Sequence, residues 1–378
     1  MKSLLQTIRK ACIMQVYTGF VNTYTMITEA GGAMNIYDIS RRAGVSIATV
    51  SRVLNNSPHV SQATRDRVMK VIEDSGYVPN AFARGLGLNS MQTIGLVCPN
   101  ASDPYLAQAL AFLEQAFRSQ GYDCLLTCTG KGPAARREGV EKLITRHVDG
   151  MVLMGSSFIE STEKGNDYIR QAARQTPIVL LNGAFPCERV YGVLCDDRRA
   201  TREAAEFLMD TGCGRILYLY DSKNDSGRRK LTGLREALAA RNAGEQEELQ
   251  AFFDGDKQDI ARVREYLLAL DRAGTRFDAV LASEDSLAVG ALKYARAAGR
   301  RVPEDVSIVG YNNSALCLYS EPELTSVDNK LRAICDRIVE TMMGVLEGRE
   351  MPQKTVFTAE LVKRGSTRQA ENEGQGGA

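Results

Sequence analysis

The chain has 378 residues, of which 44% are hydrophobic, so it is long enough for two or three domains with buried cores. Lysine and arginine number 47 against 46 aspartates and glutamates, a balance that by itself indicates no charged partner. No apolar run approaches the ~20 residues of a membrane span. Polar residues also interrupt residues 1–20 before the apolar core of a secretory signal could form, so we expect a cytoplasmic protein with no membrane partner.

The cysteines and histidines give no indication of a metal site. Nine cysteines occur without a Cys-x-x-Cys motif, and most lie in apolar runs, which is typical of reduced, buried thiols such as those expected at Cys98 and Cys128. The two histidines, His59 and His147, have no neighbour at metal-ligand spacing. We therefore expect neither a metal nor any other cofactor.

The charge distribution separates the front of the chain from the rest. Residues 35–90 contain seven basic and four acidic residues, whereas residues 91–378 contain 37 basic and 41 acidic ones. The front section is therefore the part better suited to a polyanion such as nucleic acid.

Residues 43–55, AGVSIATVSRVLN, contain a density of β-branched residues that would ordinarily favour a strand. Three features favour a helix instead. Ser46 is a suitable N-cap, apolar residues recur at i, i+3 and i+4 from Val50, and the sequence NNSP at 55–58 stops the run.

Two further short helices flank this one. The upstream helix ends at Gly44, so residues 44–46 form a tight turn between two helices, which is the helix-turn-helix arrangement. The downstream helix, SQATRDRVMKVIEDSG, is capped by Ser61 and ends at Gly76. The apolar faces of these two helices consist of Ile36, Ile39, Ala43, Val68, Val71 and Ile72.

The segment that contains these helices resembles the DNA-binding headpiece and hinge of the LacI/GalR family of bacterial transcription regulators. It reads NIYDISRRAGVSIATVSRVLNNSPHVSQATRDRVMKVIEDSGYVPNAFARGLGLNS, and the similarity continues to the RGST sequence near residue 366. The resemblance implies a sequence-specific DNA-binding transcription regulator, with repression as its expected action. It also implies binding to operator DNA as a homodimer and control by a small-molecule effector.

A recognition helix in the major groove exposes its first turn to base edges. Arg52 is the best candidate for discrimination, since a guanidinium can bind guanine O6 and N7 together for ~1–3 kcal/mol; the alternative for Arg52 is a surface ion pair. Ile47 and Ala48 offer only apolar contact, and the hydroxyls are placed for phosphates. The residues assigned to DNA on the resemblance are Ser46, Ile47, Ala48, Thr49, Ser51, Arg52, Asn55, Arg84 and Leu86.

The sequence PNAFARGLGL at 79–88 resembles the hinge helix of the family, which folds when a dimer sits on its operator. Leu86 matches the leucine wedge that enters the minor groove and kinks the duplex, and Arg84 matches the minor-groove arginine. Gly85 and Gly87 depart from the family pattern, and each costs ~1 kcal/mol of helix propensity relative to alanine. We therefore expect a hinge that is weakly helical in the absence of DNA.

From Thr93 onward, short apolar runs alternate with helical stretches, a pattern that predicts parallel sheets with helices on both faces. Strands are expected at 93–99, 123–129, 149–155, 177–183, 215–220, 278–284 and 307–311, and helices at 105–121, 135–147, 198–212, 227–240 and 285–299. On the resemblance they form two similar lobes of the periplasmic-binding-protein type, and the chain crosses between the lobes near 184–190, 327–330 and 347–351.

The effector is expected in the cleft between the lobes, at the carboxyl ends of the strands. Aromatic residues there could stack on a ligand, and the polar ones could bind hydroxyls or charge. For several of the acidic residues, the alternative role is a helix cap. The residues that match cleft-facing loops of the family are Asp103, Tyr105, Ser156, Phe158, Asn182, Phe185, Asp196, Lys230, Glu284, Asp285 and Asn312.

The ligand is expected to be a small polar metabolite, most simply a sugar or a sugar derivative. The family commonly has an arginine at the position of Lys230 and an aspartate at the position of Asn312. Keeping Lys230 beside Arg228 and Arg229 while losing that carboxylate would favour a carboxylate or phosphate on the ligand. The opposing interpretation is a cleft kept acidic by Asp196, Glu284 and Asp285.

Other classes of function explain less of the chain. A cytosolic sugar-binding protein without DNA-linked regulation accounts only for the second half. An enzyme on such a sheet would need a phosphate loop or a nucleophile, and none of G-x-G-x-x-G, G-x-x-x-x-G-K-[ST] or G-x-S-x-G occurs. We therefore expect a regulator and no enzyme.

The expected domains are a helix-turn-helix domain at 34–78, a hinge at 79–91, a two-lobed effector and dimerisation domain at 92–366, and a polar tail at 367–378. The tail lacks the leucine heptads of a tetramerising helix. The family pattern begins just after Met34, and codons for residues 29–33 can hold a purine run like a ribosome-binding site. We therefore expect translation to begin at Met34 and residues 1–33 to have no folded role.

Overall fold

The computed structural model describes residues 34–54, 57–77, 90–130, 132–241 and 249–369. The N-terminal extension, most of the hinge and three residues assigned to DNA, Asn55, Arg84 and Leu86, lie outside this part of the chain. Two compact units are present, Met1–Met91 and Gln92–Ala378, and each is described by itself.

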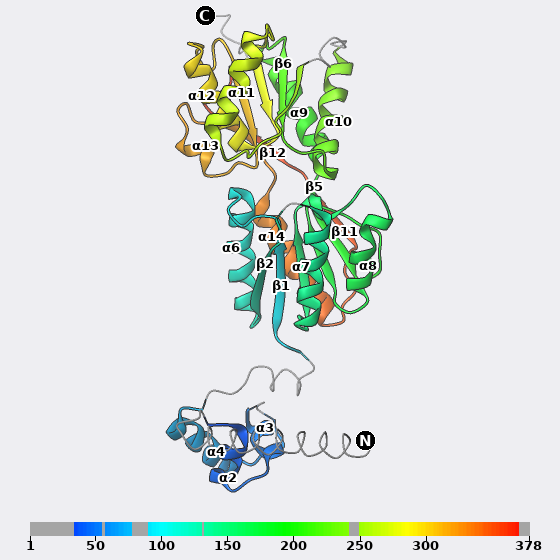
Figure 1. Cartoon of the computed structure of the whole chain (residues 1–378), viewed down its shortest axis with the longest axis vertical. Helices are drawn as coiled ribbons and strands as arrows, with labels where there is room; N and C mark the ends of the chain where they lie inside the picture. Colours follow the sequence, from blue (N-terminus) through cyan, green and yellow to red (C-terminus); the bar gives the residue numbers. More distant parts are fainter. Residues whose placement is uncertain (1–33, 55–56, 78–89, 131, 242–248, 370–378) are drawn as a thin grey trace, which may run out of the picture. The chain divides into compact units, whose positions relative to one another are not determined.

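The first unit contains three helices, α2 (Ile36–Ala43), α3 (Ile47–Leu54) and α4 (Gln62–Ser75), as the sequence predicts (Figure 1). They enclose a small core to which each helix contributes two buried residues. The buried residues are Ile39, Ala43, Val50, Val53, Val68 and Ile72.

Local signals fix the ends of these helices. Asn35 and Asp38 form a capping box at the start of α2. Gly44 ends α2 in the left-handed region, with φ of 64°, where glycine carries no Cβ penalty. The Ser46 hydroxyl accepts the Thr49 N–H at 3.1 Å and so caps α3. The β-branched residues around Val50 therefore pack inside a helix bundle and form no strand.

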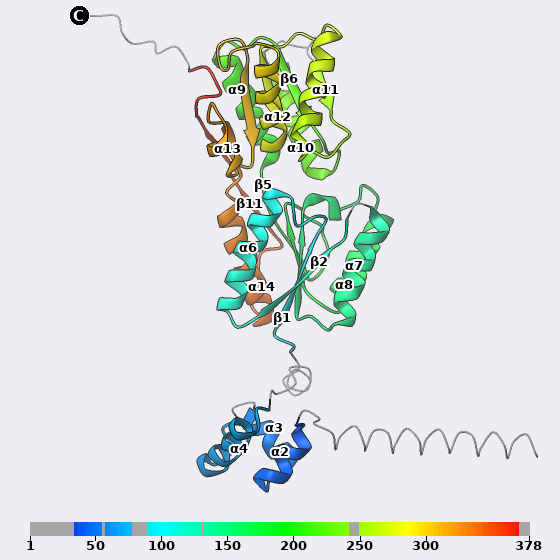
Figure 2. The same cartoon turned by 60° about the vertical axis from the view of Figure 1, so that its left-hand side comes forward.

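The second unit consists of two lobes, each built on a six-stranded sheet (Figure 2). In lobe 1 the strand order is β11-β5-β4-β3-β1-β2. Helices α6 and α14 pack on one face of this sheet, and α7 and α8 pack on the other. The bounds are β1 Thr93–Cys98, α6 Pro104–Ser119, β2 Asp123–Cys128, α7 Pro133–Thr145, β3 Gly150–Met154, α8 Asp167–Ala173, β4 Ile178–Leu181, β5 Val190–Cys195, α14 Leu331–Leu346 and β11 Lys354–Phe357, with short 3₁₀ turns at Ser156–Phe158 and Lys164–Asn166.

In lobe 2 the strand order is β12-β10-β9-β8-β6-β7. Helices α11 and α12 cover one face, and α9 and α10 cover the other. The bounds are α9 Asp197–Asp210, β6 Ile216–Tyr220, α10 Asp225–Ala240, β7 Gln250–Phe252, α11 Ile260–Arg272, β8 Ala279–Ala282, α12 Asp285–Ala297, β9 Ser307–Tyr311, α13 Leu316–Tyr319, β10 Thr325–Asp328 and β12 Glu360–Val362.

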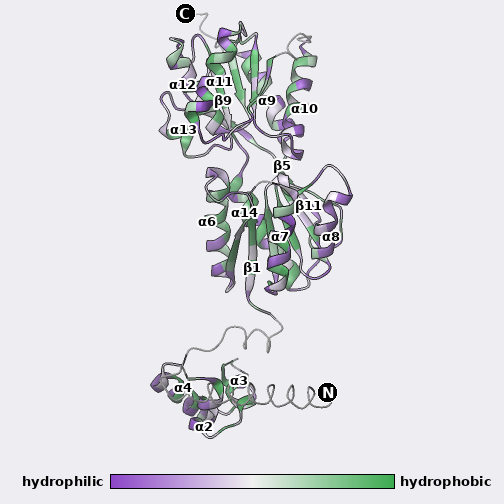
Figure 3. Ribbon diagram, in the orientation of Figure 1, coloured by the Kyte–Doolittle hydropathy of each residue, from purple (hydrophilic) through white to green (hydrophobic). Residues whose placement is uncertain are grey.

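The inner strands are apolar throughout because both faces of each sheet are covered. In β1, for example, Ile94 and Leu96 face α6 and α14, whereas Val97 faces α7 and α8. The hydropathy colouring in Figure 3 shows this concentration of hydrophobic residues on the strands. All seven expected strands and all five expected helices are present.

Two of the three expected crossings between the lobes are wrong. The chain first leaves lobe 1 after β5, which is a further strand of sheet 1, and enters lobe 2 at α9. The third passage lies between β11 and β12, not at 347–351. The crossing expected at 327–330 is confirmed between β10 and α14.

The misplaced first crossing has a local cause at Gly192. This glycine sits inside β5, where a Cβ would lie 2.5 Å from the Gly183 carbonyl oxygen. A glycine in a short apolar run weakens the strand signal, although here it permits close approach of the loop after β4.

Among the described helices, none combines the length and the apolar character that crossing a bilayer requires. Cys98 and Cys195 are buried, as expected, whereas Cys128 is exposed. Cys128 ends β2, an edge strand, so its side chain lacks the cover of a second neighbouring strand.

Candidate nucleic-acid interface and interlobe cleft

The candidate nucleic-acid interface is the outer face of α3. Val50 and Val53 face the core of the first unit, so the helical period leaves Ser46, Ile47, Ala48 and Arg52 exposed, with Thr49 and Ser51 half-buried between the two faces. Ile47 is 39% exposed, which is high for a large apolar side chain. Four of the six described candidates are therefore exposed at or after the start of α3, and the other two lie at the border of its buried face.

Arg52 is free to contact a partner. Its guanidinium makes no ion pair with any residue in the described part of the chain. Arg65 has a different role, because its guanidinium donates to the carbonyls of Val53 and Ser57, at 3.3 and 2.8 Å, and fixes the end of α3 against α4. Arg52 is accordingly better suited to a base edge than Arg65.

The second candidate site is a cavity of about 670 Å³ between the two lobes. Loops at the carboxyl ends of strands from both sheets line it, as expected for this type of fold. Seven of the eleven expected effector residues line the cavity: Asp103, Tyr105, Ser156, Asn182, Lys230, Glu284 and Asn312.

The other four expected effector residues do not line the cavity. Phe158 is fully buried in the core of lobe 1, and Phe185 packs against that core with the Arg170 guanidinium 4.9 Å from its ring centre. Asp196 caps α9 by accepting the Arg199 N–H, and Asp285 is buried with hydrogen bonds from Ser314 and Ser326. Contact of these four residues with an effector therefore stays a prediction. The residue that follows a strand often serves to close the next helix or loop.

In lobe 1, the cleft holds a short network around Asn182. The Asn182 side-chain amide donates to the Tyr105 hydroxyl at 2.7 Å, while the amide oxygen of Asn182 has no partner within the described chain. Asn182 has a positive φ of 58°, a conformation that asparagine tolerates better than most residues. This oxygen is buried, so it is an unsatisfied acceptor in the wall of the cleft.

In lobe 2, Lys230 is held against an aromatic ring. Its ammonium donates to the Ser283 carbonyl at 2.8 Å and lies 3.5 Å from the centre of the Tyr311 ring. The Tyr311 hydroxyl in turn donates to Asp197 at 2.7 Å. Lys230 is thus a buried cation whose nearest partners are a carbonyl and a ring face.

The basic cluster expected around Lys230 does not form. Arg229 pairs with Asp197 and Asp225, both at 3.1 Å, and Arg228 pairs with Asp225. Neither arginine lines the cleft. Of the three adjacent cations expected to favour an anionic ligand, only Lys230 lines the cleft.

Lys257 and Asp221 are two of the cleft residues that were not predicted from the sequence. The Lys257 ammonium pairs with Asp103 of lobe 1 at 2.9 Å and with Glu284 of lobe 2, and lies 3.8 Å from Asp221. Asp221 directly follows β6, so the strand-end rule could have identified it. Lys257 follows β7, a strand of only three residues that carries little periodicity, and had no such signal.

These contacts shift two ionisation equilibria. Burial raises the pKa of Glu284 to about 7, helped by Asp221 and Asp103 and opposed by Lys257. Burial lowers the pKa of Lys257, but the attraction of Glu284, Asp221 and Asp103 outweighs it, so the net direction is upward. Lys257 therefore stays charged, while Glu284 titrates near neutral pH.

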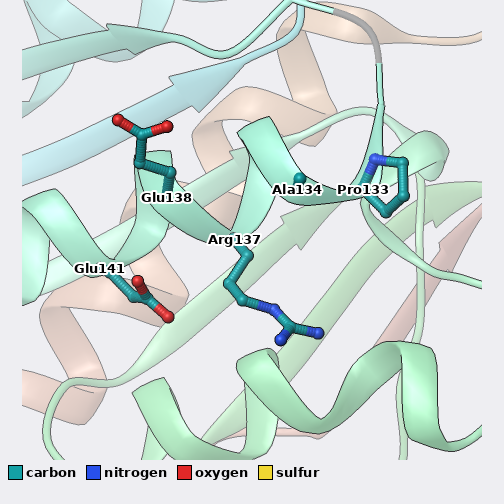
Figure 4. Close-up of a pocket in the computed structure, with 5 residues that line it drawn as sticks. All are labelled: Pro133, Ala134, Arg137, Glu138 and Glu141. Atoms are coloured by element: carbon teal, nitrogen blue, oxygen red, sulfur yellow. The ribbon is translucent and has the colours of Figure 1, made fainter.

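A further hollow, of about 350 Å³, lies along α7 (Figure 4). It is lined by Pro133, Ala134, Arg137, Glu138 and Glu141, whose polar side chains point in different directions. Glu138 pairs with Lys142 on the same helix at 2.7 Å. Within the described residues, no group of three or more histidines, cysteines, aspartates or glutamates is placed to hold a metal ion.

A helix-turn-helix unit joined to a two-lobed domain with a polar cleft defines the class of DNA-binding regulators that carry a periplasmic-binding-protein-like domain. Residues 35–80 match the family described as bacterial regulatory proteins, lacI family, and residues 205–367 match a periplasmic binding protein-like domain. The chain belongs to the lacI family and is a DNA-binding transcription regulator.

Relatives and solved structures agree with this membership. An HTH-type transcriptional regulator of Lachnoclostridium phytofermentans is 45% identical over 334 residues, which cover 88% of this chain and 99% of the relative. The Escherichia coli regulator AscG is 31% identical over 87% of this chain and 97% of its own length. The lac repressor dimer bound to operator and the anti-inducer ONPF shares the fold, with a TM-score of 0.78 at 24% identity over 89% of this chain and 99% of that one.

A complex of the transcriptional regulator CelR with cellobiose is also similar. It has a TM-score of 0.63 and 30% identity over 88% of this chain and 99% of that one. The expected family and the expected fold class, a helix-turn-helix headpiece followed by a two-lobed domain with parallel sheets, are both confirmed.

Proposed function

We propose that this regulator is a repressor that binds its operator as a homodimer and responds to a small carbohydrate or carbohydrate derivative in the interlobe cleft. The observation that carries the proposal is the combination, in one chain, of an exposed recognition-helix face and a polar cavity lined from both lobes. The similar CelR structure contains cellobiose, and this supports a carbohydrate as the ligand class.

On the DNA side, we assign base-edge contacts to Ile47, Ala48 and Arg52 and phosphate contacts to Ser46, Thr49 and Ser51. Asn55, Arg84 and Leu86 remain part of the proposal, although they lie outside the described residues. Leu86 is the minor-groove wedge and Arg84 the minor-groove arginine of a hinge that folds on the operator.

On the effector side, we assign ligand contacts to the seven expected residues that line the cavity and add Asp221. Tyr105 offers a ring face, Asn182 an unsatisfied amide oxygen, and Lys230 a buried cation. The proposed domain limits are 34–78, 79–91, 92–366 and 367–378, and the proposed location is the cytoplasm.

The test is gel retardation of the upstream region of the protein's own operon at several salt concentrations. Phosphate contacts make specific binding fall steeply with salt, and a regulator should retard this DNA more strongly than an unrelated fragment. Leu86→Ala should weaken specific binding while leaving nonspecific binding nearly unchanged. Equal operator binding by Leu86→Ala and the unmodified chain would rule out the hinge assignment.

The competing proposal is a sugar-binding protein without DNA-linked regulation. It predicts no preference for the upstream fragment at any salt concentration. A thermal-shift screen of the full chain against sugars, sugar acids and sugar phosphates tests the part that both proposals share. A ligand at one hundred times its dissociation constant should add ~2.7 kcal/mol of stability.

A further inference from the structure

The interlobe cleft already contains a side chain that binds in the manner of a ligand. Lys257 extends from the loop between β7 and α11 of lobe 2, and its ammonium reaches Asp103 at the start of α6 in lobe 1, at 2.9 Å. It also pairs with Glu284 and approaches Asp221 to 3.8 Å. We call Asp103, Asp221 and Glu284 the cleft carboxylates.

The neighbouring residue adds a second link between the lobes. The Gln258 amide donates to the Ser102 carbonyl at 3.0 Å, one residue before Asp103. The short loop after β7 therefore contacts the start of α6 through a charged and a neutral hydrogen bond. In this arrangement, Lys257 joins carboxylates of both lobes across the cavity.

The cleft carboxylates have more acceptor capacity than one ammonium can fill. A carboxylate has about four acceptor positions. Asp103 also accepts the Tyr105 and Leu106 N–H groups with one oxygen, and Asp221 accepts the Ser283 hydroxyl at 3.2 Å. The remaining positions of all three carboxylates share the Lys257 ammonium. Lys230 is held by the Ser283 carbonyl and the Tyr311 ring, and Arg136 pairs with Glu160. Neither of these other cations of the cavity wall has a described ion pair with a cleft carboxylate.

The same arrangement disfavours an anion at this end of the cavity. A carboxylate or phosphate placed beside Lys257 would also lie beside three acidic side chains. A hydroxyl or an amine, by contrast, can donate to the cleft carboxylates in the way that Lys257 does.

We propose that Lys257 is a tethered stand-in for the effector: the effector is a polyhydroxy or amino compound that donates to Asp103, Asp221 and Glu284 and displaces the Lys257 ammonium. This inference rests on the proposed role of the cleft as the effector site. Displacement transfers the link between the lobes from a side chain to the ligand. Effector binding thereby changes which groups hold lobe 1 to lobe 2.

The first test asks whether the cleft carboxylates accept a free ammonium. Lys257→Met keeps an unbranched side chain and removes the charge, and Lys293→Met removes an exposed lysine of the same lobe as a matched control. We expect n-butylammonium chloride to raise the melting temperature of Lys257→Met by roughly 2–4 °C and to leave the control unchanged. Sodium chloride at equal concentration should not reproduce the shift, and butanol, which carries one hydroxyl and no charge, should give a smaller one.

A melting temperature of Lys257→Met that is indifferent to butylammonium, or equally sensitive to sodium chloride, overturns the proposal. If Lys257→Met does not fold, Asp103→Asn takes its place, because it removes only the lobe 1 carboxylate. The proposal then requires Asp103→Asn to weaken binding of a neutral sugar by about tenfold. Unchanged sugar binding by Asp103→Asn would overturn it.

The second test compares glucose, glucosamine and glucose 6-phosphate by calorimetry on the full chain and on Lys257→Met. Removal of an internal competitor should tighten binding of glucose or glucosamine by about tenfold and should not tighten binding of the phosphate. Weaker binding of all three by Lys257→Met overturns the proposal, since Lys257 would then be a ligand-binding group. If butylammonium stabilises Lys257→Met while no sugar binds the unmodified chain or Lys257→Met, the carbohydrate proposal fails. The proposal that Lys257 occupies the place of the effector is then still supported.

Discussion

Arg52 is a single residue on which the sequence preference of this regulator should depend. It is exposed on α3 and has no described ion pair, so its guanidinium is available to a guanine edge. Arg52→Ala should flatten the preference at one base pair in each half-site, with a loss of ~1–3 kcal/mol for the preferred base. Binding to a library of operator variants measures this directly.

The matched control is Arg67→Ala, which removes an exposed arginine from α4 of the same unit. Loss of that charge should change affinity for all operator variants alike and leave the preference intact. If Arg52→Ala and Arg67→Ala gave the same uniform loss, Arg52 would be a phosphate contact and would not read a base.

Glu284 should make stability depend on pH near neutrality. Burial raises its pKa to about 7 in the folded chain, above the ordinary value of 4.5. Between these values, the folded chain holds a proton that the unfolded chain has lost. The resulting stabilisation is fully present below pH 4.5 and is lost as the pH rises through about 7.

The measurement is denaturant unfolding of the unmodified chain and of Glu284→Gln between pH 5 and 8. The difference in unfolding free energy between the two should change by an amount of the order of 1–3 kcal/mol over this range, always toward a relative loss for the unmodified chain as pH rises. Glu141→Gln, at an exposed position on α7, should show no such trend. A flat difference for Glu284→Gln would mean that this carboxylate is ionised throughout.

At the scale of elements, the contact between α9 and α10 depends on Gly233. A Cβ at this position would lie 1.9 Å from the Arg198 carbonyl oxygen on α9. Both groups belong to helices, so neither can move without shifting its whole element. We expect Gly233→Ala to force the helices apart and to destabilise lobe 2 by about 1–3 kcal/mol, seen as a lower melting temperature.

Gly214→Ala provides the control in the same lobe. A Cβ there would meet only the Asp278 carboxylate, at 3.8 Å, which is ordinary contact. Its melting temperature should match that of the unmodified chain or rise slightly, since alanine reduces the freedom of the unfolded state. Equal melting temperatures for the two variants would contradict the close approach of α9 and α10.

Seven of the twelve described strands were predicted, and inner strands such as β1, β3 and β9 were predictable because burial on two faces makes them continuously apolar. The strands β5, β7, β10, β11 and β12 were not predicted. The points at which the chain crosses between the lobes were harder to predict. They depend on which sheet each edge strand joins, and the four residues of β11 only alternate between exposed and half-buried. Pairing between strands that are far apart in the sequence cannot be recognised from the local sequence.

The cleft residues likewise include some that could be predicted from the sequence and some that could not. Asp103, Glu284 and Asn312 follow strands and were predictable from that position alone. Asp196 and Asp285 also stand at strand ends but do not line the cavity, and their carboxylates accept backbone and hydroxyl donors. Asp103 caps α6 in the same way and yet lines the cavity, so capping alone does not separate the two groups. Lys257 was not predictable, because its role depends on the approach of a lobe 2 loop to lobe 1.

At the scale of the whole molecule, we expect two chains on each operator. α3 has eight residues, and only its exposed first turn and Arg52 can reach base edges, so one headpiece recognises few base pairs. Two chains related by a two-fold axis double these contacts over paired half-sites, and the symmetry of the protein is then matched by a near-palindromic operator. An isolated half-site should consequently bind far more weakly than the palindrome.

Analytical ultracentrifugation of the full chain at micromolar concentration should give the mass of a dimer, and titration of a palindromic operator should saturate at two chains per duplex. Changing the spacing between half-sites by about half a helical turn should abolish the preference for the palindrome, because the second recognition helix then faces the wrong side of the duplex. In a control duplex, the half-sites are moved apart by a full turn, about 10 base pairs, so that both recognition helices still face the DNA. Any loss of binding to this duplex reflects distance alone. A monomeric or tetrameric mass, or one chain per palindrome, would contradict the proposed assembly.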